Sequence, residues 1–307
     1  MNVQQRIVPH LWFDEEAMEA AEFYTAIFPS SNISDIMNLH NTPSGDPEIV
    51  SFTLWGYEFM AINGGSIFTM NPAISFMVNF DPFREANAEE MIDDIWEKLS
   101  EGGTVLMPFE TYPFSKKYGW IQDKYDLSWQ LILTDPEGEE RPPIIPSFMF
   151  VGNNYGKAEE AMEHYLTIFR DGKQGCIARY PDGIDQDETG TIMFSDFNLL
   201  GQWFVAMDSG TKQPHHFNEA ISFLVKCDTQ KEIYYYWHRL TAVPEAEQCG
   251  WLKDEFGLSW QIVPQEQDNK MSSHSTPEQR AQVIQAILKM KKVDLEVLRE
   301  AFYEGEA

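Results

Sequence analysis

Short apolar stretches and helix-like stripes alternate along this chain in a repeating order. Near the start, the stretch IVPHLWF predicts a strand, and the alanine and aromatic positions within residues 17–28 recur at helical spacing. Three strand-like stretches follow at 33–40, 47–54 and 57–63, separated by Asn, Pro, Gly and Asp. The predicted unit is therefore strand, helix, strand, strand, strand.

The same order occurs three more times, which makes four predicted βαβββ units. The second unit is predicted from a strand at 73–80, a helix at 85–99 and strands near 104–109, 118–123 and 128–134. The third is predicted from a strand at 147–151, a helix at 156–169 and strands as far as residue 207. The fourth is predicted from a strand at 220–226, a helix at 229–240 and a final pair of strands.

Four sequence matches indicate that the second half of the chain repeats the first. In chain order they pair AMEAAEFYTAIF with AEEAMEHYLTIF, GYEFMAIN with GQWFVAMD, AISFMVNFD with AISFLVKCD, and GWIQDKYDLSWQ with GWLKDEFGLSWQ. Ordered matches of this kind are the mark of an internal duplication. The Pro-rich stretch GEERPPIIPS marks the joint, so we predict two domains, 1–142 and 143–268, each with two units.

The last part of the chain, residues 276–307, predicts two helices. Thr276, Pro277 and Gln279 have the sequence of a capping box with Pro at the first helical position. An apolar stripe follows, and VDLEVLREAF predicts the second helix. A stripe of this kind usually packs on the parent domain or on a second subunit.

Charge limits the classes of partner. The sequence holds 22 Lys and Arg against 49 Asp and Glu, a formal net charge of −27, and the acidic residues are spread along the chain. Such a surface repels phosphate backbones and anionic lipid head groups. We therefore expect neither nucleic acid nor a membrane surface as a partner.

Cysteine content and the N-terminal sequence favour a cytoplasmic protein. Three scattered cysteines are too few for a disulfide framework. The opening MNVQQRIVPHLWF lacks the basic and long apolar regions of a signal peptide. No apolar run approaches the roughly 20 residues that a membrane helix needs.

Three stretches carry a resemblance to a known family: the opening PHLWFDEEAMEAAEFYTAIFP, the closing pair YGWIQDKYDLSWQLI and CGWLKDEFGLSWQIV, and AILKMKKVDLEVL in the tail. They resemble the vicinal oxygen chelate (glyoxalase/bleomycin-resistance) superfamily and, within it, the PhnB-like branch labelled 3-demethylubiquinone-9 3-methyltransferase. The resemblance covers nearly the whole chain. It implies an α+β fold of tandem domains that curl around cavities. It also implies either a monomer with an internal pseudo-dimer or a homodimer.

The resemblance also bears on metal binding. Metal-dependent members of the superfamily carry His, Glu or Gln ligands on the first and last strands of their units. The matching positions here are His10, Ala73 and Gln130, with an apolar position near Phe59, in the first copy, and Ser147, Ala220 and Gln261 in the second. One imidazole and one amide hold a divalent ion poorly. We therefore expect no metal and no other cofactor; if a metal binds, His10 and Gln130 are its expected ligands.

A polar strip on the closing strands suggests a ligand site instead. On a strand, SWQ places Ser128 and Gln130 on one face and Trp129 on the other. We predict a small organic ligand in one or both cavities, held for sequestration or for chemistry that the sequence does not define. The expected lining is His10, Trp12, Ser128 and Gln130 in the first copy, and Ser147, Met149, Ser259 and Gln261 in the second.

Two other interpretations stay open, and a third is disfavoured. One is a metal-dependent enzyme of glyoxalase or dioxygenase type; the other is a structural or partner-binding module, in which the repeated Trp and Gly serve packing and turns. Methyl transfer is disfavoured because a cofactor such as S-adenosylmethionine normally binds at a Gly-rich turn between a parallel strand and a helix. Neither NGGS nor EGG leads into such a helix.

Overall fold

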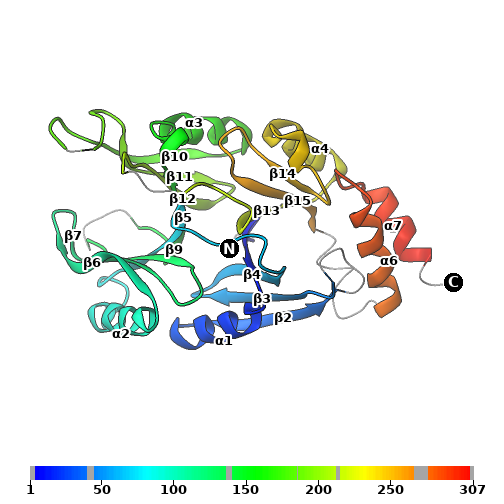
Figure 1. Ribbon diagram of the computed structural model, residues 1–307, viewed down its shortest axis with the longest axis horizontal. Helices are drawn as coiled ribbons and strands as arrows, with labels where there is room; N and C mark the ends of the chain where they lie inside the picture. The colour runs from blue at the N-terminus through cyan, green and yellow to red at the C-terminus, as the bar shows by residue number, and fades with distance from the viewer. Residues whose placement is uncertain are drawn as a thin grey trace.

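The structure is a computed structural model in which two curved sheets lie side by side along the long axis of the molecule (Figure 1). The eight-stranded sheet occupies one end and the seven-stranded sheet the other, and helices cover their outer faces. The mixed α+β class predicted from the sequence is confirmed. The structure describes residues 4–39, 45–135, 140–184, 186–211, 215–265 and 276–304.

The seven-stranded sheet joins the first unit with the fourth. Its order is β14 (Trp251–Lys253), β15 (Ser259–Pro264), β13 (Ile221–Cys227), β1 (Ile7–Phe13), β4 (Tyr57–Asn63), β3 (Glu48–Leu54) and β2 (Asn32–Asn38). The two units meet where β1 and β13 pair antiparallel, with His10 opposite Ser222.

The eight-stranded sheet joins the second unit with the third. Its order is β10 (Lys173–Arg179), β11 (Ile192–Leu199), β12 (Gln202–Asp208), β9 (Ile144–Phe150), β5 (Ile74–Phe80), β8 (Ser128–Leu133), β7 (Ser115–Gln122) and β6 (Thr104–Tyr112). Here β5 and β9 pair antiparallel, with Ser75 opposite Ser147.

Each sheet therefore takes one unit from each half of the sequence. The boundaries 1–142 and 143–268 remain a prediction of where each copy of the repeat begins and ends. Both sheets contain strands from each side of that boundary. The fourth unit also differs from the others. In the continuously described stretch 215–265, it has three strands, because a 3-10 turn at Pro244–Ala246 follows its helix where the other units have a strand.

Four helices follow the first strands of the four units, and two more form the C-terminal tail. Each of the first four packs on strands of its own unit, for example α1 on β3 and α3 on β11. The tail begins with the predicted capping box, in which Thr276 and Gln279 exchange both hydrogen bonds. The helices are α1 (Ala17–Ile27), α2 (Ala88–Ser100), α3 (Ala158–Ile168), α4 (Gln230–Leu240), α6 (Pro277–Leu288) and α7 (Leu295–Glu304).

One continuous apolar core holds the two sheets together, and much of it is aromatic. Phe59 on β4 meets Phe76 on β5 with ring centroids 5.0 Å apart, and Phe148 on β9 meets Phe223 on β13 at 5.3 Å. Both contacts join one sheet to the other in edge-to-face geometry, which aromatic pairs favour. None of the helices in the described ranges is long and apolar enough to cross a membrane.

The repeated GW…D…LSWQ stretch builds a buried hydrogen-bond centre around Asp123, in the turn after β7. Its Oδ2 accepts hydrogen bonds from the Tyr24 hydroxyl and from Trp129 Nε1, each at 2.8 Å. Its Oδ1 accepts from the backbone N–H groups of Tyr125 (2.8 Å) and Leu127 (3.1 Å). Because Tyr24 lies on α1 of the first unit, this carboxylate ties the first unit to the second.

Asp254 repeats this centre in the second half. Its Oδ2 accepts from the Tyr165 hydroxyl (2.7 Å) and Trp260 Nε1 (2.8 Å), and its Oδ1 accepts from two backbone N–H groups. Burial raises the pKa of both Asp123 and Asp254 to about 6, although the four hydrogen bonds to each carboxylate oppose the rise. The twin sequence therefore encodes a structural cross-link in each half.

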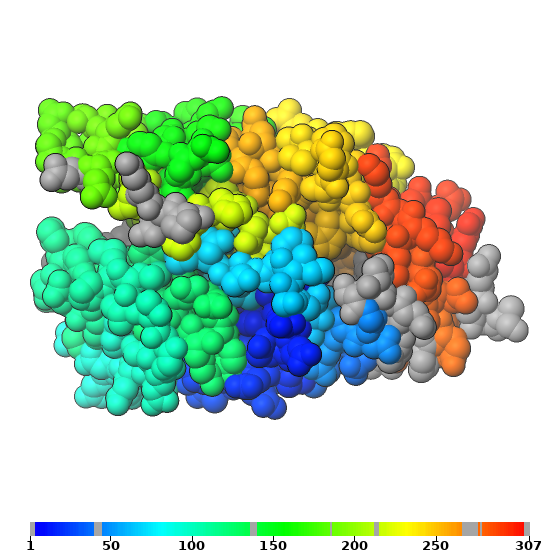
Figure 2. Space-filling model, viewed as in Figure 1, coloured from blue at the N-terminus to red at the C-terminus, as the bar shows by residue number. Residues whose placement is uncertain are grey.

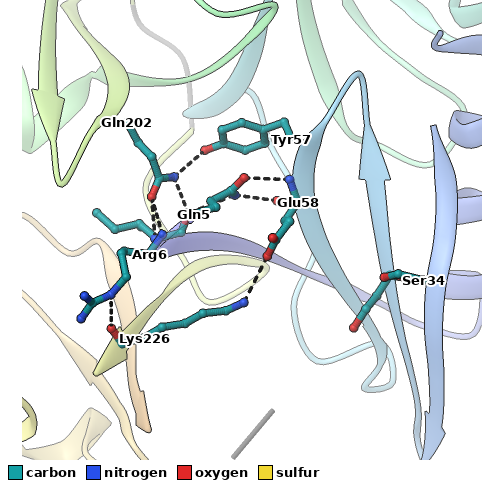
Figure 3. Close-up of polar contacts among 9 residues, drawn as sticks. Gln5, Arg6, Ser34, Tyr57, Glu58, Gln202 and Lys226 are labelled. Atoms are coloured by element: carbon teal, nitrogen blue, oxygen red, sulfur yellow. Dashed lines mark hydrogen bonds and ion pairs between the residues drawn. The ribbon is translucent and has the colours of Figure 1, made fainter. Parts of the chain in front are cut away.

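The N-terminal end of β1 is bound to the second half by side chains (Figure 3). Gln202, at the start of β12, accepts from Ile7 N at 2.7 Å and donates to Ile7 O at 2.6 Å. Lys226 on β13 pairs with Glu58 on β4 at 3.1 Å, and Arg6 Nε donates to the Lys226 carbonyl at 2.8 Å. These contacts lie at the junction of the two sheets and connect residues between 168 and 220 positions apart.

We expect Asp123→Asn to lower the free energy of unfolding by about 2–4 kcal/mol, because the amide leaves two buried donors, on Tyr24 and Trp129, without an acceptor. Urea unfolding measures the loss. Asp254→Asn should cost a similar amount, and the exposed Asp126→Asn should stay within about 0.5 kcal/mol of the wild type. A neutral Asp123→Asn variant would contradict a structural role for this centre.

The pH dependence of unfolding provides a second check. A carboxyl whose pKa is about 6 when folded and about 4 when unfolded binds more protons in the folded state between those values. Its stabilising contribution is complete below the unfolded value and is lost as the pH rises through 6. Lowering the pH from 7 to 5 should therefore raise the unfolding free energy of the wild type by about 1 kcal/mol more than that of Asp123→Asn. An equal response of both chains would contradict the raised pKa.

Candidate functional site

The concave face of the eight-stranded sheet encloses a cavity of about 630 Å³, which we call the open cup. Figure 2 shows the molecular surface hollowed at this end, between the teal residues of the second unit and the green residues of the third. Five methionines and five aromatic residues contribute to its wall: Met77, Met107, Met149, Met193 and Met207, with Phe114, Tyr118, Trp120, Tyr180 and Phe194. None of the described residues that line it is Lys, Arg, Asp or Glu.

Gln130 on β8 anchors a small polar network on the cup wall. Its Nε2 donates to Ser75 Oγ at 2.8 Å and to Ser147 Oγ at 3.4 Å. The Tyr118 hydroxyl donates to its Oε1 at 2.7 Å. Burial raises the pKa of Tyr118, so this phenol stays protonated and acts as a donor. The network joins strands from both halves of the chain.

Trp120 provides a further polar atom that faces no protein partner. It lies on β7, two residues from Tyr118, so both side chains point to the same face of the sheet. Its Nε1 is buried, and among the described residues no group accepts its hydrogen bond. A buried N–H without an acceptor is costly, which makes this atom a natural partner for a ligand acceptor.

The concave face of the seven-stranded sheet carries a second group of candidate residues, and we call this face the His10 cup. His10 on β1 is 4% exposed, and burial lowers its pKa to about 4, so the imidazole is neutral at physiological pH. Its Nδ1 has no hydrogen-bond partner within the described chain. Gln261 on β15 donates to Ser222 Oγ at 2.9 Å, and Trp251 lies edge-on to the His10 ring at 5.7 Å.

Each sheet thus contains predicted site residues from both copies of the sequence repeat. His10, Trp12, Ser259 and Gln261 belong to the seven-stranded sheet, whereas Ser128, Gln130, Ser147 and Met149 belong to the eight-stranded sheet. Placing His10 in one cavity with Gln130 was wrong, because the strands of each half separate into different sheets. Of the eight predicted residues, Gln130 and Met149 line the open cup. Ser128 and Ser259 are completely buried, and Oγ of each has no partner in the described residues.

Sequence reasoning missed Ser75, Tyr118 and Trp120. The signal was present as period-2 alternation: on β7, Tyr118 and Trp120 share one face, as Gln130 and Ile132 do on β8. Interpreting the repeated Gly-Trp pair as packing hid this signal. The alternation becomes informative only when the face that lines the cup is known.

Trp12 fills part of the His10 cup. Its ring lies directly over Gly64, where an added Cβ would come within 2.1 Å of the indole, and its Nε1 donates to Gly65 O at 2.7 Å. Phe68 meets the same ring at 5.2 Å. Glycine at position 64 is therefore required for the tryptophan to lie flat against the chain.

At the equivalent positions of the second copy, smaller or polar residues line the open cup. Met149 replaces Trp12, Ser209 replaces Gly64, and His215 replaces Phe68. The wall of the open cup therefore has no tryptophan or phenylalanine at the positions equivalent to Trp12 and Phe68. These paired replacements make the side chains on the two concave faces different.

The donor atoms in both cups do not fit a divalent cation. The groups beside His10 are neutral, and Gln261 is already bonded to Ser222. In the open cup, Gln130 is bonded to Ser75, Ser147 and Tyr118. Across the described ranges, no three His, Cys, Asp or Glu side chains gather closely enough to hold an ion. Metal sites need several anionic or imidazole donors on one ion, and this arrangement lacks them.

Comparison with solved structures supports a glyoxalase-like architecture. Glyoxalase I from Zea mays has the same fold, with a TM-score of 0.50 and 10% identity over 84% of this chain and 93% of that chain. The PhnB protein from Bacillus cereus is 41% identical over 42% of this chain and 100% of that chain, with a TM-score of 0.38. No curated protein sequence matches the chain.

A family model agrees with the internal duplication. The model described as 3-demethylubiquinone-9 3-methyltransferase matches the chain twice, over residues 5–132 and 142–263. The two matches fall on the two sequence halves and together cover most of the chain. The chain therefore belongs to the PhnB-like 3-demethylubiquinone-9 3-methyltransferase family, within the vicinal oxygen chelate fold.

Proposed function

We propose that this protein binds one uncharged aromatic small molecule in the open cup, and that no metal takes part. The observation that carries the proposal is the wall of the cup: methionine and aromatic side chains around one buried polar network. A cavity of about 630 Å³ with a few placed polar groups is typical of small-molecule sites. Both halves of the chain contribute strands to the cup, so one chain is sufficient to complete it.

The ligand is uncharged because the described wall offers no charge to pair with it. Burying an unpaired ion costs several kcal/mol. The formal net charge of −27 also repels anions as they approach. A neutral compound avoids both penalties.

The ligand is aromatic and carries a hydrogen-bond acceptor. Thioethers make favourable contacts with aromatic rings and adapt to irregular shapes, and five methionines line the cup. The unpartnered Trp120 Nε1 provides a donor for a carbonyl or ring nitrogen of the ligand. Gln130 and Tyr118 give a second polar contact at the wall.

Methyl transfer, which the family description names, has little support in the open cup. S-adenosylmethionine carries an ammonium, a carboxylate and a sulfonium, and the described wall has no charged side chain to bind them. The start of α3 is also occupied: the Asp208 carboxylate accepts from Gly156 N and Ala158 N. We infer binding, for sequestration or for chemistry on a neutral ligand, in place of methyl transfer.

We expect Met149→Trp combined with Ser209→Gly to weaken ligand binding at least about tenfold, because the pair recreates the Trp12–Gly64 packing inside the open cup. Fluorescence titration with Nile red, an uncharged aromatic dye, measures the affinity. Two controls keep the cavity open: Ser209→Gly alone and Met149→Leu should each stay within about threefold of the wild type. Unchanged binding in the double variant would place the ligand elsewhere.

Metal removal gives an independent expectation. Dialysis against a chelator should leave the Nile red affinity unchanged, because the donor groups of both cups are neutral and already bonded. Elemental analysis of the purified protein should find far less than one transition-metal ion per chain. About one ion per chain, lost together with ligand binding on chelation and restored with it, would overturn the metal-independent proposal.

A further inference from the structure

The tail helices α6 and α7 form a hairpin that contacts both edges of the seven-stranded sheet. At one edge, beside β14, Cys249 N donates to Met290 O and Gly250 N donates to Lys291 O, each at 2.8 Å. These bonds attach the connection between α6 and α7 to the two residues just before β14. Space-filling atoms of the hairpin lie at the end of the molecule opposite the open cup (Figure 2).

A second attachment runs through α4. Gln230 Nε2 donates to Val293 O at 3.0 Å, and its Oε1 accepts from Leu295 N at 2.7 Å. One side chain thus satisfies the backbone at the start of α7. Val293 is 1% exposed, and its Cγ2 packs against Gly250.

The opposite edge of the sheet meets the same hairpin through apolar contacts. Met37 on β2 and Leu39 just after it pack against a small cluster whose buried members all lie in the hairpin: Val283, Ile284, Val293 and Leu298. Since β14 and β2 are the two edges of a seven-stranded sheet, a hairpin that touches both must span its concave side. The hairpin therefore lies across the mouth of the His10 cup.

The described part of the chain has no second helical hairpin that could cover the open cup. Between the end of β8 at Leu133 and the start of β9 at Ile144 the chain is too short for two helices. After β15, by contrast, the chain continues to residue 307. In the described residues, the α6–α7 hairpin at the seven-stranded sheet has no counterpart at the eight-stranded sheet.

We propose that the α6–α7 hairpin is a cover over a second ligand site, centred on His10, that becomes accessible when the hairpin detaches. His10 and Ser259 lie in one row across this sheet, each paired with Ser222, and His10 Nδ1 and Ser259 Oγ have no partner in the described residues. The Trp251 ring contacts both the His10 ring and the Trp12 ring. These groups suit an uncharged aromatic compound with a hydroxyl or amide donor for the imidazole. The inference does not depend on occupancy of the open cup.

The attachment is small enough to open without unfolding the core. It consists of a few hydrogen bonds, an apolar cluster separate from the main core, and the side chain of Leu295 on α7, which packs in the main core. Segments held by such limited contacts open at a lower free energy than the global transition. The hairpin therefore exposes the His10 cup while the two sheets stay folded.

Site-specific labelling of histidine by diethyl pyrocarbonate, followed by peptide mass spectrometry, tests the cover in the full chain. Neutral imidazoles react, so His10 should label at least about tenfold more slowly than the exposed His216 in the same molecule. Val293→Asp places a charge in the hairpin cluster and should raise the His10 rate at least about tenfold. The matched control Val297→Asp, on the exposed face of α7, should leave the rate unchanged.

Two results would overturn the proposal that the hairpin covers His10. One is equal labelling rates of His10 and His216 in the wild type. The other is an unchanged labelling rate of His10 in Val293→Asp, although amide exchange shows that the hairpin has detached. If Val293→Asp fails to fold, labelling of the wild type in low urea tests the same proposal. As urea increases, the labelling rate of His10 should rise in parallel with the amide exchange rates of α6 and α7. Labelling that follows exchange of β5 and β9 instead would show that only global unfolding exposes His10.

Nile red titration tests whether the exposed face binds a ligand. Val293→Asp should bind about one equivalent more than the wild type, and adding Met60→Trp should remove that equivalent. Met60 pairs directly with His10 across β1 and β4, so a larger side chain there fills the cup. No added equivalent, or one that survives Met60→Trp, would refute the second site. The test compares the number of dye equivalents bound by each variant. Dye bound in the open cup is common to all of them and cancels in the comparison.

Discussion

Two buried carboxylates, Asp123 and Asp254, hold this architecture together. Each accepts a tyrosine hydroxyl, an indole N–H and two backbone N–H groups, and the tyrosine always comes from the neighbouring unit. Each therefore fastens a unit of the seven-stranded sheet to a unit of the eight-stranded sheet within one half of the chain. Burial makes the carboxylates costly, and the four donors offset that cost only when the units sit in register.

Strand pairing provides the complementary link, between the halves. At the seams β1 with β13 and β5 with β9, each sheet continues from one half of the chain into the other. Gln130 from the first half thereby reaches Ser147 from the second. The polar network of the open cup is thus a consequence of the seams, and neither half contains it alone.

The sequence predicted the repeating units, the capped tail and the two faces of the SWQ strands well, because these depend on local periodicity and capping. It could not predict which unit pairs with which. All four first strands are apolar and almost equally suited to pair with one another, so the choice depends on register and on contacts between distant residues. That is why His10 and Gln130 were expected together and lie in different sheets. The sequence also did not show that Tyr118 and Trp120 line the open cup. The positions of aromatic residues along a strand do not reveal which face of that strand borders a cavity.

Fusion of the two copies into one chain also breaks their symmetry. Two separate identical halves, paired in the same way, would build two identical hollows, and any substitution would appear in both. In the fused chain, Trp12 with Gly64 and Met149 with Ser209 are independent choices. The two concave faces could therefore acquire different side chains, and the α6–α7 hairpin contacts the edges of one sheet. Covalent linkage thus allows the two concave faces to differ from each other, which is impossible in a homodimer of identical halves.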